Sequence, residues 1–141
     1  MKRFLFAVTL ILSLLLTACS KEGELEIGPP APLDAVPNIV GEYAVNGFDP
    51  LGTEYSGRLS IFPGDSADTY TMQWIIVGSI QEGDGRLDGN ILHVEWRQVE
   101  GVVGQTQGTT TYTVSDNGVL DGTRLVEGHP NEGPETAYPN Q

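Results

Sequence analysis

The sequence predicts an all-β fold of about eight antiparallel strands, arranged as a meander that closes into a small up-and-down barrel. Three observations support this fold class. Apolar and polar residues alternate in short runs, and no sustained helical spacing occurs after residue 39. Clusters of Gly, Asp, Asn and Pro separate the runs. The connections are too short for crossovers and closure removes exposed strand edges, which favours a barrel over the alternative, a β-sandwich.

Each run places its large apolar residues on one face. Tyr70, Met72 and Trp74 illustrate this period of two. The separators Asp88-Gly89-Asn90 and Asp116-Asn117-Gly118 contain the residues that adopt the positive φ angles of tight hairpins. The expected strands cover residues 41–46, 54–62, 69–78, 79–86, 91–97, 98–103, 108–115 and 118–126.

The N-terminus has the pattern of a secretory signal. A basic start, Met1-Lys2-Arg3, precedes an almost wholly apolar run, Phe4–Leu16, which is shorter than a membrane-spanning helix requires. The acidic residues and prolines that follow cannot support a helix interior. We therefore expect a signal helix and peptide at 1–18, a lipidated, disordered, acidic and proline-containing tether at 19–38, the β-barrel domain at 39–138, and a C-terminal tail at 139–141.

The segment Leu16-Thr17-Ala18-Cys19 resembles the lipobox of bacterial lipoproteins. This resemblance implies cleavage between Ala18 and Cys19, with diacylglycerol and a further acyl chain such as palmitate attached to Cys19. Several acyl chains on one residue give stable membrane anchoring. Ser20, rather than Asp, follows the cysteine, as in lipoproteins sent to the outer membrane of enteric-type bacteria. The expected location is the bacterial cell envelope, with a lipid anchor in the outer membrane.

Composition excludes several classes of function. The 141 residues carry a net charge of −12, which becomes −14 once residues 1–18 leave. An acidic chain of this kind is not expected to bind nucleic acid. A single cysteine excludes an intrachain disulfide and, with two histidines, leaves too few ligands for a Cys/His zinc site. No cofactor is expected.

Catalytic and metal-binding patterns are weak. His93 alternates out of phase with its apolar neighbours and His129 lies in a loop, and neither accompanies a nucleophile motif. Abundant carboxylates could serve a glycosidase in principle, but most fall at turns or outward positions. Aspartates at turns form no recognisable calcium loop. The sequence therefore predicts neither an enzyme nor a metal site.

The barrel interior has candidate ligand-binding residues. Five aromatic side chains share the inward register, where they either stack on a small ligand or form a packed core. Arg124 also alternates with inward residues, so it either binds an anion or carboxylate in the lumen or lies near the mouth and extends into solvent. The candidate lumen residues are Tyr55, Tyr70, Trp74, Trp96, Tyr112 and Arg124.

A series of short motifs occurs in order along the expected strands. The motifs are Tyr43-x-Val45-x-Gly47-x-x-Pro50-x-Gly52-x-x-Tyr55-x-Gly57-x-Leu59-x-Ile61, Tyr70 with Trp74, Gly83-x-Gly85, Gly89-Asn90-x-Leu92-x-Val94, Tyr112, Asn117-Gly118-x-Leu120-x-Gly122 and Gly133-x-Glu135. This series resembles a family of small secreted or lipid-anchored bacterial proteins with a β-barrel-like domain and no assigned function. The family usually has Trp where this chain has Arg124, and some members carry the label fibronectin-binding. The resemblance implies no catalytic residue.

Together these observations predict a membrane-anchored envelope lipoprotein that acts as a non-enzymatic binding or structural module. Its expected partners are the membrane, through the lipid on Cys19, and an envelope or extracellular protein. The alternative is a carrier of a small apolar or anionic ligand in the barrel lumen. An envelope hydrolase is the third hypothesis.

Overall fold

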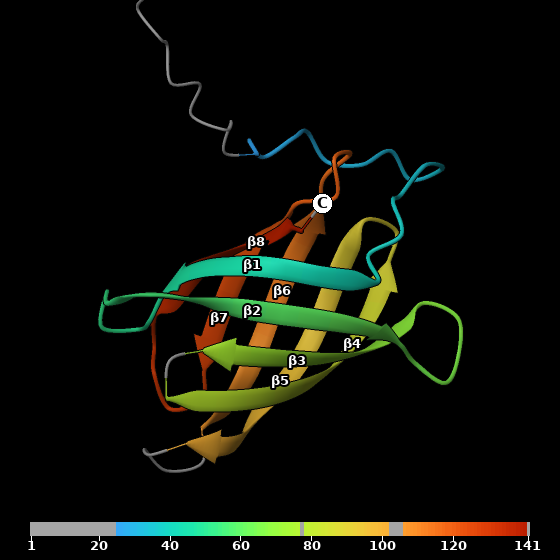
Figure 1. Ribbon diagram of the computed structural model, residues 1–141. Helices are drawn as coiled ribbons and strands as arrows, with labels where there is room; N and C mark the ends of the chain where they lie inside the picture. The colour runs from blue at the N-terminus through green and yellow to red at the C-terminus, as the bar shows by residue number, and fades with distance from the viewer. Residues whose placement is uncertain (1–24, 77, 102–105, 141) are drawn as a thin grey trace, which may run out of the picture.

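The computed structural model describes residues 25–76, 78–101 and 106–140 and forms a single eight-stranded barrel (Figure 1). The signal peptide, the cleavage site at Ala18 and the lipidation site at Cys19 lie outside the described residues. The strands are β1 (Gly41–Phe48), β2 (Glu54–Pro63), β3 (Thr69–Ile76), β4 (Ser79–Asp88), β5 (Ile91–Gly101), β6 (Gln107–Val114), β7 (Leu120–Val126) and β8 (Glu132–Pro139).

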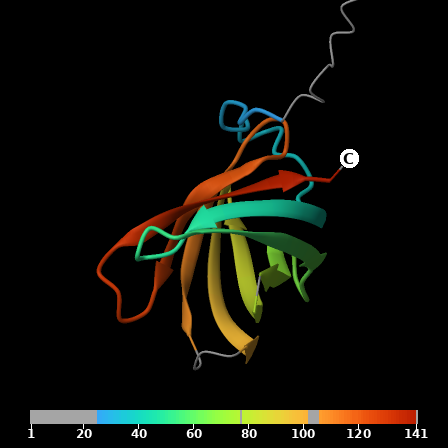
Figure 2. The ribbon, with the colours of Figure 1, turned by 60° about the vertical axis from the view of Figure 1, so that its left-hand side comes forward.

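Each strand pairs antiparallel with the next, and β1 pairs with β8 to close the barrel (Figures 1 and 2). The expected all-β up-and-down barrel is thus confirmed, and the sandwich alternative is wrong. The register between β1 and β8 aligns Val45 with Ala137 and Gly47 with Glu135. Within the described residues no helix is long and apolar enough to cross a membrane.

Two details of the strand prediction are wrong. The expected strand at 98–103 does not begin at residue 98, because β5 continues from Ile91 to Gly101 through an irregularity in its pairing with β4. The true last strand, β8, was not predicted. Its inward residues include Gly133 and Ala137, which are too small to produce an apolar alternation in the sequence.

The N-terminal part of the described chain, residues 25–40, lies across one end of the barrel, and we call it the strap (Figure 1). The Ala31 amide donates to the Val114 carbonyl, and the Asn90 side chain donates to the Ala31 carbonyl. Ala31 and Ile39 are buried. The expectation that the domain begins only at residue 39 is therefore wrong. The expected tail is also part of the fold, because Pro139 ends β8 and the Asn140 amide donates to Glu42.

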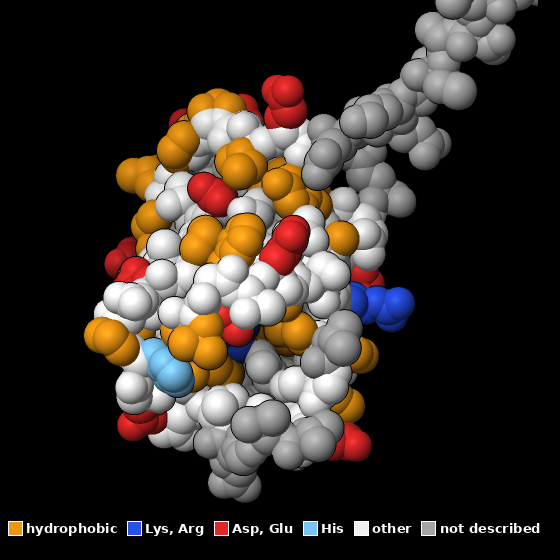
Figure 3. Space-filling view, turned by 90° about the vertical axis from the view of Figure 1, so that its left-hand side faces the viewer, with side chains coloured by type: hydrophobic (Ala, Val, Ile, Leu, Met, Phe, Trp, Pro, Cys, Tyr) orange, Lys and Arg blue, Asp and Glu red, His pale blue; other side chains and the backbone are white. Residues whose placement is uncertain are grey.

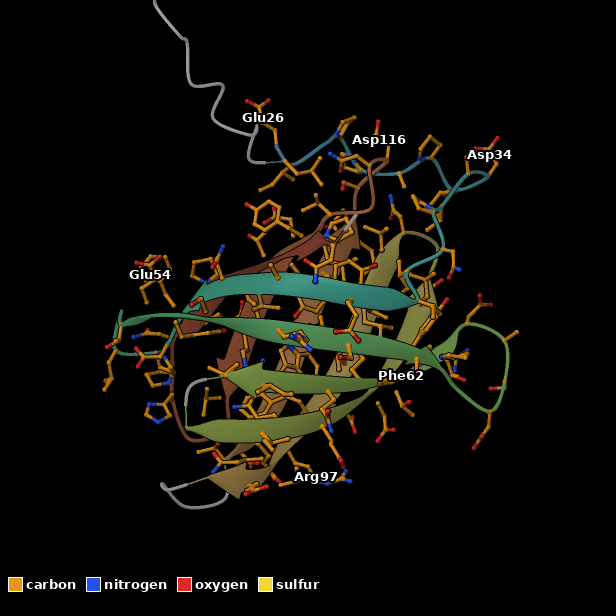
Figure 4. All side chains as sticks on the ribbon, in the orientation of Figure 1. Glu26, Asp34, Glu54, Phe62, Arg97 and Asp116 are labelled. Atoms are coloured by element: carbon orange, nitrogen blue, oxygen red, sulfur yellow. The ribbon has the colours of Figure 1, made fainter. Side chains whose placement is uncertain are left out.

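The strap end also contains the turns between β2 and β3, β4 and β5, and β6 and β7. The connections after β1 and β7, together with the C-terminal ends of β3 and β5, lie at the opposite end, which we call the hairpin end (Figure 2). Glu26, Asp34 and Asp116 all lie at the strap end, whereas Glu54 lies at the hairpin end (Figure 4). The strap therefore gives the two ends of the barrel different surfaces.

Replacing Asn117 with alanine is expected to loosen the strap. The Asn117 side chain donates to the Glu26 carbonyl and accepts from the Ser115 hydroxyl, so it joins the strap to the β6–β7 turn. Loss of these bonds should cost about 1–2 kcal/mol and speed proteolysis within residues 25–38. Limited proteolysis followed by mass spectrometry measures this rate. Asn46→Ala, on the exposed face of β1, is the matched control.

Large and small residues complement one another inside the barrel, as the taper of a small barrel requires. A Cβ at Gly83 would approach the Trp74 ring to 2.9 Å, and a Cβ at Gly108 would approach the Trp96 ring to 2.9 Å. Glycine at these positions makes room for the two indoles. The buried apolar core consists of Ile39, Tyr43, Val45, Leu59, Ile61, Met72, Trp74, Leu92, Val94, Trp96, Tyr112, Val114, Leu120 and Ala137.

Candidate functional site

The most unusual feature of the interior is a buried carboxylate, Glu135, in a row of cross-strand neighbours. Glu135 lies opposite Gly47 of β1 and Gly122 of β7. Beyond these glycines, Tyr55 pairs with Gly47 and Tyr112 pairs with Gly122. The row therefore alternates large and small residues. Because neither glycine has a side chain, the Glu135 carboxylate can reach both tyrosines.

Three side chains donate hydrogen bonds to Glu135, which is fully buried. The Tyr55 hydroxyl donates to Oε2 at 2.5 Å, and the Tyr112 hydroxyl donates to Oε1. Arg124 Nη1 lies 3.1 Å from Oε2 and 3.5 Å from Oε1. A carboxylate excluded from water needs such a complete set of donors, because an unpaired buried charge is costly.

Arg124 projects inward from β7 and is only 5% exposed. Its guanidinium carbon lies 3.8 Å from the centroid of the Trp96 ring and 5.2 Å from that of Trp74, in the geometry of a cation–π contact. Nη2 donates to Gln81 Oε1. Gln81 lies on the inner face of β4 in regular alternation with Gly83 and Gly85, and the pairing irregularity beside it leaves out Val99 of β5.

The structure brings the predicted lumen residues together, with important differences between them. Trp74, Trp96 and Tyr112 are buried in the core, whereas Tyr55 and Tyr70 are partly buried against it. Four of the five predicted aromatic side chains contact the Arg124–Glu135 pair, namely Tyr55, Tyr112, Trp74 and Trp96. The fifth, Tyr70, lies toward the strap end.

The alternative in which Arg124 extends into solvent is wrong, because Arg124 is buried against Glu135. Glu135 and Gln81 were not identified as site residues from the sequence. The only available signal for Glu135 was its place in the Gly133-x-Glu135 motif, because its strand was not predicted. This salt bridge makes the interior electrically neutral, so Arg124 presents no uncompensated charge to an anionic ligand.

The Arg124–Glu135 pair lies in the half of the barrel nearest the hairpin end. The strand segments nearest this end contain Tyr55 of β2, Gln81 of β4, Arg124 of β7 and Glu135 of β8, whereas Tyr112 lies nearer the strap end of β6. Figure 3 faces this end and shows a recessed Lys or Arg side chain among hydrophobic side chains. The strap covers the other end with Ala31 and Ile39, so the polar site is oriented toward the hairpin end.

Burial raises the pKa of several tyrosines. The pKa of Tyr43 rises from 10.0 to about 12, first through burial and then through the charge of Tyr70. The Tyr55 and Tyr112 pKa values are also raised, by burial first and then by the negative charge of Glu135. The Tyr70 pKa is raised as well, by burial first and then by the negative charge of Asp68. These hydroxyls therefore remain hydrogen-bond donors at neutral pH.

The raised tyrosine pKa values predict loss of stability in alkaline solution. Below about pH 10 the tyrosines are protonated in both the folded and unfolded states, so they leave stability unchanged. Above it, the unfolded chain ionises first, and the free energy of unfolding should fall steadily as the pH rises toward about 12, where Tyr43 titrates. Urea midpoints between pH 8 and pH 11.5 measure the effect. A midpoint that stays constant across this range would contradict the assignment.

The outer surface differs in character from the interior. His93 and His129 are exposed, as expected from the sequence, and lie on β5 and in the β7–β8 connection. Asp84 and Glu95 are exposed and directly paired across β4 and β5. They line a shallow hollow of about 670 Å³ over β3–β6, together with Arg86 and His93. Among the described residues no cluster of three His, Cys, Asp or Glu side chains could hold a metal ion.

Few positive charges balance this acidic surface. Of the four arginines in the described ranges, Arg124 is buried, Arg58 pairs with Glu42 at 3.8 Å and Arg97 pairs with Glu82 at 3.6 Å. Only Arg86 lacks an ion pair within this part of the chain, and it lies in the hollow.

In comparisons with known proteins, no protein-family model and no curated protein matches the sequence.

Proposed function

We propose that this chain is a lipid-anchored bacterial envelope lipoprotein whose barrel is a non-enzymatic binding module. The supporting observation is the neutral, hydrogen-bonded interior, where Arg124 is already paired with Glu135. The outer surface of the barrel would then be the part that recognises a partner. Closure of the barrel leaves no strand edge for pairing with another chain, so contacts are made by side chains.

The hollow over β3–β6 is the proposed contact surface. Asp84 and Glu95 are like charges in directly opposed positions, which destabilises a sheet unless another group compensates them. A protein partner with basic side chains would neutralise both carboxylates. The excess of acidic over basic side chains elsewhere on the barrel also steers basic partners toward it.

The strap determines how the proposed anchor would hold the barrel. Leu25 follows Cys19 by six positions, and six residues of extended chain span at most about 20 Å. A lipid on Cys19 would therefore keep the strap end close to the bilayer and direct the hairpin end outward. Acidic residues at the strap end, including Glu26, Asp34 and Asp116, would be repelled by anionic headgroups (Figure 4).

Lipidation is tested by expressing the full chain in a bacterial host with an alkyne analogue of palmitate. The wild-type chain should incorporate the label and partition into a detergent phase, whereas Cys19→Ala should do neither. Cys19 is the only cysteine, so the variant removes every thiol. Equal partitioning of both proteins would overturn the lipid anchor and leave the binding function to be judged separately.

Binding is tested by recovering partners from native envelope with lipidated protein and identifying them by mass spectrometry. Wild type should recover a specific basic protein, and the double variant Asp84→Asn, Glu95→Gln should lose it. The control Glu54→Gln, Glu132→Gln removes the same charge from exposed positions outside the hollow. Equal recovery by the two double variants would overturn the contact surface, and no specific partner for wild type would overturn the binding module.

A carrier of a small ligand in the lumen is the second candidate function. One observation favours it: three buried polar atoms near the Arg124–Glu135 pair lack hydrogen-bond partners, namely Trp74 Nε1, Trp96 Nε1 and Thr110 Oγ1. Extraction of the purified protein with organic solvent, followed by mass spectrometry, should then release a stoichiometric small molecule. Its absence would leave the binding module as the function.

A further inference from the structure

The interior contains more hydrogen-bond donors than its own acceptors can satisfy. Glu135 accepts from Tyr55, Tyr112 and Arg124, and Gln81 Oε1 accepts from Arg124. These bonds engage Nη1 and Nη2 of Arg124, and its Nε–H donates no hydrogen bond within the described residues. The Trp96 indole N–H and the Thr110 hydroxyl are also unpartnered.

The unpartnered donors lie close together in the fold. Thr110 on β6 pairs directly with Arg124 on β7. The Trp96 ring packs against the Arg124 guanidinium, and its Cζ2 atom, which is two bonds from the indole nitrogen, lies next to Gly108. Gly108 precedes Thr110 by two positions and therefore lies on the same face of β6. The Trp96 N–H edge, the Thr110 hydroxyl and Arg124 thus surround one part of the lumen.

Trp74 is treated separately from this group. Its indole N–H makes no hydrogen bond of good geometry, but it offsets a small part of the rise in the Tyr112 pKa, as a weak donor to that hydroxyl would. Trp96 and Thr110 have no such neighbour among their described contacts. They are 3% and 1% exposed, so bulk water does not compensate them.

We propose that the lumen binds a neutral oxygen acceptor between Trp96 Nε1, Thr110 Oγ1 and the unused N–H groups of Arg124. Neutrality follows from the Arg124–Glu135 pair, because an added anion would be a buried charge without a counterion. Three donors are sufficient to hold one oxygen, since a buried water usually makes about three hydrogen bonds. The oxygen belongs either to an internal water or to a carbonyl or hydroxyl group of a small neutral ligand.

The first test is the sign of the stability change in Thr110→Val, which removes the hydroxyl and keeps the shape. If Thr110 binds an oxygen, the variant loses a hydrogen bond and the urea midpoint should fall. If the hydroxyl is an unpaired buried group, its removal relieves a desolvation cost and the midpoint should rise. Thr110→Ser keeps the hydroxyl, and Thr111→Val makes the same change on the outer face. An unchanged or higher midpoint for Thr110→Val overturns the proposal.

The second test observes the acceptor directly. Both tryptophans of the chain lie in the lumen, so the two indole N–H signals in a ¹⁵N-labelled NMR spectrum report only on this region. A cross-relaxation peak from the Trp96 N–H to a long-lived water identifies an internal water. A peak to a non-water proton, with a small molecule released on denaturation, identifies a ligand. If both peaks are absent, the proposal is overturned. Thr110→Val should weaken whichever peak is present.

Discussion

Replacing Glu135 with glutamine is expected to lower the free energy of unfolding by about 3–5 kcal/mol. The amide keeps the size of the side chain but removes the charge that compensates Arg124, which is 5% exposed. It also turns one acceptor oxygen into a donor group that faces a tyrosine hydroxyl, because Tyr55 donates to Oε2 and Tyr112 donates to Oε1. Urea unfolding followed by tryptophan fluorescence measures the loss of stability. Both tryptophans, Trp74 and Trp96, contact Arg124.

Two further variants separate the charge effect from general damage. Glu82→Gln removes an exposed carboxylate that pairs with Arg97 at 3.6 Å, and should cost at most about 1 kcal/mol. The double variant Arg124→Met, Glu135→Leu removes both buried charges, and should be considerably more stable than Glu135→Gln alone. This double variant keeps the prediction testable if Glu135→Gln does not fold. Equal effects of Glu135→Gln and Glu82→Gln would contradict the buried ion pair.

Replacing Gly108 with alanine is expected to lower the free energy of unfolding by about 3 kcal/mol, at the upper end of overpacking effects. A Cβ at Gly108 would overlap the Leu125 carbonyl oxygen of the neighbouring strand and approach the Trp96 ring. The backbone cannot yield as a side chain can, so β6 and β7 would have to separate. Chemical unfolding gives the stability, and a shift of the tryptophan emission maximum relative to wild type reports displacement of the Trp96 ring.

Gly85→Ala is the matched control for this change. A Cβ at Gly85 would lie 3.2 Å from Met72 Sδ and 3.3 Å from Leu92 Cδ1, which are the ends of flexible side chains. These can shift by a few tenths of an ångström, so the cost should be clearly smaller than at Gly108. Equal costs at the two positions would show that contact with the backbone is not what requires glycine at Gly108.

The sequence predicted the inner face of the barrel more accurately than its ends. Alternation around Trp74, Trp96 and Tyr112 correctly placed these side chains inside, because a period of two is a local property of each strand. The strap was not predicted to pack on the barrel. Its prolines indicate an extended chain, but only the position of Val114 and Asn90 shows where that chain binds.

The candidate site was predicted in part. The alternation of Arg124 with Leu120 and Gly122 predicts that Arg124 faces inward. The same alternation does not predict that Glu135 is its partner. Glu135 lies in a strand with weak apolar alternation, and 11 positions separate it from Arg124. Whether an inward arginine binds a ligand or is neutralised by the chain itself depends on this pairing. The pairing replaces both alternatives for Arg124, anion binding in the lumen and extension into solvent, with neutralisation by a carboxylate of the chain itself.

The sequence by itself determined the all-β class, most strand positions and the face on which each aromatic lies. These properties come from local patterning and turn chemistry, so each strand carries them independently. Only the tertiary structure decided that β8 closes the barrel against β1, that the strap covers one end, and that Arg124 meets Glu135 beside Gln81. The physical reason is that cross-strand register joins residues far apart in the chain, and register is a property of the closed sheet as a whole.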